Sequence, residues 1–158
     1  MLLERARRIP PSGEATELLG LLQFFVGGFV LFVATVGVQL ALSSFYDDFA
    51  AVIGWGINAV LIAMISMICA WILGLPLRHI PRLRSWWLSN GEWPVAGVVL
   101  GFVALCFVVS LAPVTQATDE FGTYEARMVD PRALLAVWGI FAFSVVHFVW
   151  PLRWTDRE

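Results

Sequence analysis

LPLRHIPRLRSWWLSNGEW, residues 75–93, places three arginines and three tryptophans between two long apolar stretches of the chain. Arginine is enriched on the cytoplasmic side of membranes, and tryptophan rings gather at the boundary between water and hydrocarbon. We therefore interpret this stretch as a loop between two membrane-spanning segments, and we expect the loop to lie at the membrane surface. The composition of the chain and the lengths of its apolar stretches bear on that interpretation.

The composition of the chain is that of a protein in lipid. Of its 158 residues, 59% are hydrophobic and 14% are charged, whereas soluble domains carry about 25% charged residues. A soluble domain of this length would lack the polar surface needed to cover so much apolar surface. The net charge of -2 gives no electrostatic footprint for nucleic acid. We expect an integral membrane protein surrounded by membrane lipids, with no nucleic-acid partner.

Four stretches without charged residues are long enough to cross about 30 Å of hydrocarbon, which takes roughly 20 helical residues. These stretches are residues 18–45, 49–75, 93–112 and 133–152. Asp130 and Pro131 are suited to begin the last of them, as a capping residue and a first-turn proline. The sequence predicts an all-α, four-transmembrane-helix bundle in a single membrane domain. The segments outside the spans are residues 1–17, 76–92, 113–132 and 153–158.

The distribution of arginine predicts the orientation of this bundle. Eight arginines fall in the two tails and the 76–92 loop: Arg5, Arg7, Arg8, Arg78, Arg82, Arg84, Arg153 and Arg157. Only Arg127 and Arg132 fall in the 113–132 loop. Because short cytoplasmic loops carry the excess of positive charge, we expect both termini and the 76–92 loop in the cytoplasm. The longer, acidic 113–132 loop is expected on the outer side.

The 76–92 loop and its border carry the residues that we expect to anchor the protein at the lipid interface. They are Arg78, Arg82, Arg84, Trp86, Trp87 and Trp93. If Pro81 begins a short helix that ends near Gly91, then Ile80, Leu83 and Trp87 share a face that lies on the membrane. Specific contact with anionic lipids and docking of a soluble partner are the alternatives.

Small residues recur inside the predicted spans, at spacings of seven residues in the first two spans and of four residues in the third. They are Gly20, Gly27, Ala34 and Ala41 in the first, Gly56, Ala63 and Ala70 in the second, and Gly97 and Gly101 in the third. Helices in membranes associate by close backbone approach over small residues. We expect these residues to form helix-packing seams, and the first two helices to form an antiparallel hairpin. A water-filled pore is the alternative, but such a pore would have almost no polar lining.

Three polar residues inside the spans are candidates for function: Gln23, Asn58 and His147. Hydrogen bonding between helices explains polar residues of this kind. An ionisable side chain within a membrane is also a functional candidate, and His147 is the one such residue in a predicted span. A haem or metal would need a second ligand at a similar depth, and the other histidine, His79, lies in the 76–92 loop. We predict no cofactor and no metal, and leave open a contribution of His147 to a cofactor or proton path in a complex.

The 113–132 loop carries four acidic residues: Asp119, Glu120, Glu125 and Asp130. Their spacing does not match an EF-hand calcium loop. We expect a solvated acidic loop, in which the aromatic side chains Phe121 and Tyr124 leave room for a protein contact.

The sequence contains no phosphate-binding GxxxxGK[ST] motif, no HExxH, no CxxC and no GxSxG. We therefore do not expect an enzyme. The expected function is that of a non-enzymatic accessory or structural subunit, or interaction partner, of a larger complex in a bacterial inner (cytoplasmic) membrane. Its partners would be other membrane-protein subunits or further copies of itself. The alternative is a small oligomeric transporter or channel component, which would need a solute site near the membrane midplane.

Overall fold

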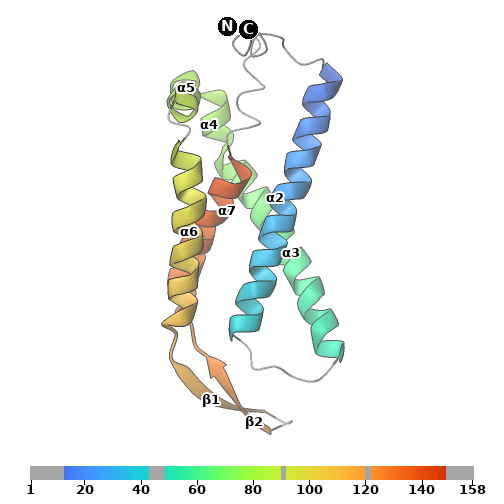
Figure 1. Ribbon diagram of the computed structural model, residues 1–158, viewed down its shortest axis with the longest axis vertical. Helices are drawn as coiled ribbons and strands as arrows, with labels where there is room; N and C mark the ends of the chain where they lie inside the picture. Colours follow the sequence, from blue (N-terminus) through green and yellow to red (C-terminus); the bar gives the residue numbers. More distant parts are fainter. Residues whose placement is uncertain (1–12, 43–48, 90–91, 120–121, 149–158) are drawn as a thin grey trace, which may run out of the picture.

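The computed structural model describes residues 13–42, 49–89, 92–119 and 122–148, and the fold over these ranges is mostly helical (Figure 1). The long helices are α2 (Gly13–Leu42), α3 (Phe49–Leu73), α6 (Glu92–Ser110) and α7 (Pro131–Val146). Two short helices, α4 (Leu75–His79) and α5 (Pro81–Ser89), and two strands, β1 (Val114–Asp119) and β2 (Gly122–Arg127), complete the described elements. A mostly helical fold agrees with the sequence prediction.

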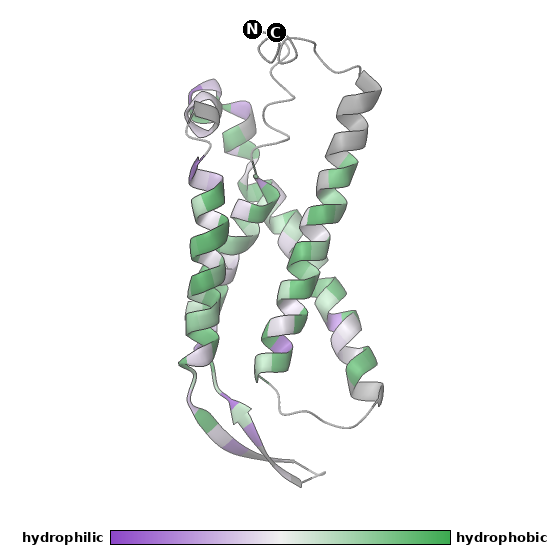
Figure 2. Ribbon diagram, viewed as in Figure 1, coloured by the Kyte–Doolittle hydropathy of each residue, from purple (hydrophilic) through white to green (hydrophobic). Residues whose placement is uncertain are grey.

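Three of the described helices are long and apolar enough to cross a membrane, which is compatible with a multi-pass membrane protein. They are Phe24–Leu42, Val52–Leu73 and Glu92–Ser110, each with a mean hydropathy of 2.2. The fourth apolar helix, Pro131–Val146, has 16 residues and is therefore about 24 Å long. Figure 2 shows hydrophobic residues along the long helices and hydrophilic residues concentrated in α4, α5 and the strands.

The helix bounds differ from the predicted spans mainly at their ends. The second and third helices agree with the prediction to within two residues at each end, while α2 begins five residues earlier than predicted. Helix α7 ends at Val146, with His147 as its C-cap, and so stops short of the predicted end of the fourth span at residue 152. Residues 43–45 and 149–152 of the predicted spans lie outside the described residues. The predicted start of the last helix is confirmed, because the Asp130 side chain accepts a hydrogen bond from the Arg132 backbone N–H and Pro131 occupies the first turn.

Helix α7 lies at the centre of the bundle. It runs beside α6 and also contacts α3 and α2, while α2 crosses α3 (Figure 1). The core cluster joins three helices and consists of Leu31 from α2, Ala63, Met67 and Ala70 from α3, and Phe141, Ala142, Val145 and Val146 from α7. Alanine in α3 and α7 lets the helix backbones approach closely, as in other membrane bundles.

The 113–132 segment contains a β-hairpin, which corrects the sequence prediction of a loop without regular structure. Strands β1 and β2 pair antiparallel, from Val114 opposite Arg127 to Asp119 opposite Gly122. The 12 strand residues include three threonines, one valine and one tyrosine, which favour strands. The hairpin is tied to the bundle where an Arg127 guanidinium N–H donates to the Ser110 carbonyl oxygen, 3.1 Å away. A cation at this position also suits the negative end of the α6 dipole.

The 76–92 segment forms the two short helices at the other end of the bundle (Figure 1). The predicted short helix beginning at Pro81 is confirmed and ends at Ser89. Ile80 and Leu83 are exposed, and Trp87 is half-buried, so the expected face of this helix is divided between the surface and the bundle.

Candidate functional site

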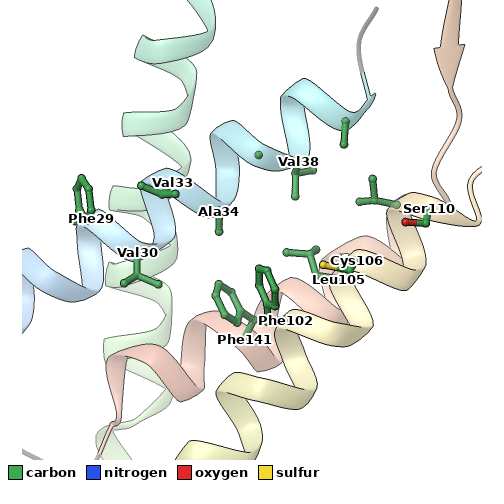
Figure 3. Close-up of a pocket in the computed structure, with 13 residues that line it drawn as sticks. Phe29, Val30, Val33, Ala34, Val38, Phe102, Leu105, Cys106, Ser110 and Phe141 are labelled. Atoms are coloured by element: carbon green, nitrogen blue, oxygen red, sulfur yellow. The ribbon is translucent and has the colours of Figure 1, made fainter.

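An apolar groove of about 560 Å³ lies between α2 and α6, with α7 at its base. Helix α2 contributes Phe29, Val30, Val33, Ala34, Gly37, Val38 and Ala41; α6 contributes Phe102, Leu105, Cys106, Val109 and Ser110; α7 contributes Phe141. Figure 3 shows side chains of both walls directed into the space between the helices, with Ser110 near the strand end of the groove. We call this hollow and its continuation the α2–α6 groove.

The groove continues along the same helices toward the α4–α5 end. A second hollow, of about 280 Å³, is lined by Leu22, Val26, Gly27, Val30, Val98, Val145 and Phe148. Val30 lines both hollows, so they adjoin, and together they follow α2 from Leu22 to Ala41. That stretch of α2 is about 29 Å long at 1.5 Å per residue, which matches the hydrocarbon thickness of a bilayer.

The walls of the α2–α6 groove are apolar and partly backbone. One side of α2 presents only small residues to the groove: Ala34, Gly37 and Ala41. A methyl group added at Gly37 would meet nothing within 4 Å. Thr35 of α2 is buried and donates to the Leu31 carbonyl oxygen at 2.8 Å. The groove is suited to hold an apolar chain or helix face. Within the described residues, no group of three or more His, Cys, Asp or Glu side chains is placed to hold a metal ion.

Several predicted seam residues lie where helices approach closely. A methyl group at Gly27 would lie 3.6 Å from the Met67 sulfur, and Ala63 and Ala70 belong to the core cluster. On α6, a methyl group at Gly101 would come within 3.0 Å of the Phe141 Cα atom. One at Gly97 would overlap the Ser144 hydroxyl, which donates to the Ile140 carbonyl oxygen.

Other predicted seam residues lie elsewhere. Ala34 and Ala41 line the α2–α6 groove, and Ala34, which is partly buried, also packs against the core cluster. Gly56 faces open space, with nothing within 4 Å of an added methyl group. Gly20 lies in α2, and its surroundings are outside the described residues. The structure thus brings part of the seam into the bundle and leaves part of it at the surface.

His147 joins three elements at the α4–α5 end of the bundle. It caps the C-terminus of α7, is 1% exposed, and its ring stacks on Phe143 with 4.3 Å between the ring centroids. Its Nδ1 atom lies 2.9 Å from the Phe143 carbonyl oxygen. The His147 carbonyl oxygen accepts a hydrogen bond of 3.2 Å from Trp87 Nε1 in α5, and Gly74 provides the space against its ring. These contacts give His147 a structural role in holding α5 against α7.

The predicted interfacial anchors divide by exposure. Trp86 and Trp93 are exposed and stack with 6.3 Å between ring centroids, and Arg82 is exposed. Trp87 is half-buried, because it bonds to His147. Arg78 lies in α4 and Arg84 in α5, and their side chains lie outside the described part of the structure, as does that of Gln23 in α2. Asn58 is exposed on α3.

Sequence reasoning missed two features of the site. The first is the α2–α6 groove, which depends on how far α2 stands from α6 and has no signal in either helix alone. The second is a hydrogen bond of 2.8 Å between Trp138 Nε1 of α7 and the Ser66 hydroxyl of α3. Ser66 lies inside the second predicted span, but its partner is 72 residues away. The free cysteines Cys69 and Cys106 are exposed, and Cys106 lines the α2–α6 groove.

Comparison of the chain with protein-family models, curated proteins and solved structures found no match.

Proposed function

We propose that the chain is a non-enzymatic accessory subunit of a larger membrane complex, and that a transmembrane helix of its partner lies in the α2–α6 groove. The observation that carries this proposal is the length of the groove. It follows α2 from Leu22 to Ala41, about 29 Å, so its occupant would cross the whole hydrocarbon layer. A transmembrane helix has that length.

The walls of the groove suit a helix. In lipid, helices gain little from burying large apolar side chains and associate where small residues allow close contact. Ala34, Gly37 and Ala41 supply such a surface on α2. The large side chains Phe29 and Phe102 at the same groove would fit between the side chains of the incoming helix. A partner helix would then complete the packing between α2 and α6.

We propose that the chain crosses the cytoplasmic membrane four times, with α7 as the fourth transmembrane helix. Both termini would lie in the cytoplasm. The division of the arginines supports it: the α4–α5 end carries Arg78, Arg82 and Arg84, as expected on the cytoplasmic side. The described start of α2 and the described end of α7 lie toward the same end, and the hairpin lies at the opposite end (Figure 1).

The experiment compares two glycine substitutions on α2. Gly37→Phe would fill the groove, whereas Gly28→Phe places the same side chain nine residues earlier, about 180° around the helix. An added methyl group meets nothing within 4 Å at either position, and Gly28 lines neither hollow. The full chain would be purified in a mild detergent from its own host, and the proteins recovered with it identified.

We expect a partner to be recovered with the unsubstituted chain and with Gly28→Phe, and to be lost with Gly37→Phe. Recovery of the same partner with Gly37→Phe would contradict the proposal. So would transport of ions or solute by the purified chain alone in liposomes, which is the result expected of a small oligomeric transporter or channel.

A further inference from the structure

The outer face of α3 carries a stripe of residues at heptad spacing, and none of them lines the α2–α6 groove. Its members alternate at spacings of four and three residues: Gly54, Asn58, Leu61, Ile65, Ile68 and Ile72. All six are exposed, and the four aliphatic members are between 52% and 59% exposed. Apolar residues repeating every 3.5 residues are the pattern of a helix that supercoils with another helix.

The stripe lies opposite the face by which α3 joins the bundle. The buried residues of α3 are Ala59, Ala63, Met67 and Ala70. At about 100° per residue, Ile72 and Gly54 lie about 180° around the helix from Ala63. The inner face of α3 is therefore made mostly of small residues that pack within the chain, and the outer face of branched aliphatic residues that do not. Because large apolar side chains alone do little to drive association in lipid, the case for a partner at this face rests on its polar member, Asn58.

Asn58 gives this stripe a specific chemistry. It lies in the apolar span Val52–Leu73, about 9 Å from the start of that span, and its side chain is exposed. An amide in hydrocarbon is costly unless it is hydrogen-bonded. The carboxamide has both donor N–H groups and an acceptor oxygen, so two asparagines can satisfy each other. Its best-matched partner is another asparagine at the same depth.

We propose that a second copy of this chain covers the stripe, forming a parallel dimer through α3. Two copies inserted with the same topology are related by an axis along the membrane normal, so each residue of the stripe meets itself. Asn58 would then pair with Asn58 of the second copy.

The heptad positions agree with such a pair. The a positions of the heptad are Asn58, Ile65 and Ile72, and the d positions are Leu61 and Ile68. A single asparagine at an a position fixes register and oligomeric state in parallel coiled coils. Gly54, one turn from Asn58, allows the two backbones to approach. The dimer uses no residue of the α2–α6 groove, so it stands independently of the proposed accessory function.

Cysteine crosslinking of the full chain in membranes tests the geometry. In a background with Cys69→Ala and Cys106→Ala, Ile65→Cys is compared with Met64→Cys. The two native side chains are similarly exposed, at 59% and 54%, but they lie about 100° apart around the helix. We expect oxidation to give a disulfide-linked dimer with Ile65→Cys and little with Met64→Cys. Equal yields, or no dimer with Ile65→Cys, would overturn the proposal.

Substitution of Asn58 tests the chemistry. Dimerisation would be followed by energy transfer between labelled full-length chains in liposomes, at increasing dilution in lipid. Asn58→Ala should weaken the dimer roughly tenfold, and Asn58→Gln, which keeps the amide, should preserve most of the affinity. A trimer, a monomer at all dilutions, or an unchanged dimer with Asn58→Ala would contradict the proposal. Gly37→Phe should leave dimerisation intact, which separates this result from that for the groove.

Discussion

At the residue scale, the contact between α6 and α7 depends on the absence of side chains. Gly101 lies against the backbone of Phe141, and a methyl group there would lie within 3.0 Å of both Cα and Cβ of Phe141. A backbone atom cannot move aside as the end of a flexible side chain can. The distance between the two helices at this point is therefore fixed by glycine.

Gly101→Ala should destabilise the protein by about 1–3 kcal/mol, because α6 and α7 would have to separate. The matched control is Gly139→Ala on α7, where a methyl group meets nothing within 4 Å. That change should be neutral or stabilising by up to about 1 kcal/mol, since alanine favours helix more than glycine does. The measurement is the free energy of unfolding in bicelles by steric trapping. Equal effects of the two substitutions would contradict this account of the contact.

The sequence alone indicates that Gly97 and Gly101 form a contact face, because they are four residues apart on one helix. It does not indicate that Ser144 and Phe141 lie opposite them, since spacing is a property of one helix and the choice of partner depends on the whole bundle. The same holds for Ala34 and Ala41, whose spacing resembles that of the buried seam although they line the α2–α6 groove.

At the scale of elements, the helices are the predictable part of the fold. The four long helices, α2, α3, α6 and α7, each contain a long run without charged residues. Asp130 and Pro131 mark the start of α7. The hairpin was not predicted, although its threonine and valine residues and Gly122 are a strand-and-turn signal. Its acidic residues favoured the interpretation as a solvated loop. The hydrogen bond between α7 and α3 could not be predicted from the sequence either, because Trp138 and Ser66 are 72 residues apart.

A double-mutant cycle with Trp138→Phe and Ser66→Ala should give a coupling energy of about 0.5–1.7 kcal/mol, as for other hydrogen bonds between membrane helices. Phenylalanine keeps an aromatic ring beside Phe141, which is now 6.0 Å from Trp138 between ring centroids, but it removes the donor. The cycle would be measured by unfolding in mixed detergent micelles. A coupling energy indistinguishable from zero would show that the bond adds nothing to the α3–α7 contact.

At the scale of the whole molecule, the two ends differ in structure and in charge. One end carries the short helices α4 and α5, and the other carries the hairpin (Figure 1). The arginine-rich end is the one that contains α5. Because arginine is retained on the cytoplasmic side, the two ends should react with reagents from opposite sides of the membrane.

Single cysteines at exposed positions would test this orientation in the background without Cys69 and Cys106. Thr118→Cys in β1 and Ser85→Cys in α5 replace exposed hydroxyl side chains. We expect a membrane-impermeant maleimide to label Thr118→Cys on intact cells, and Ser85→Cys only after the membrane is opened. Labelling in the reverse order would invert the proposed topology.

The central position of α7 also has a consequence for biogenesis. Helices are synthesised in chain order, so α2 and α3 can pair before α6 exists, whereas α6 packs chiefly against α7. Until residues 131–146 have been synthesised, α6 lacks the helix against which it mainly packs. The space that α7 fills would then be open to lipid. The last of the described helices in the chain is thus the one that closes the bundle. Its packing against α5, where Trp87 donates a hydrogen bond to the His147 carbonyl oxygen, completes the contacts among the described helices.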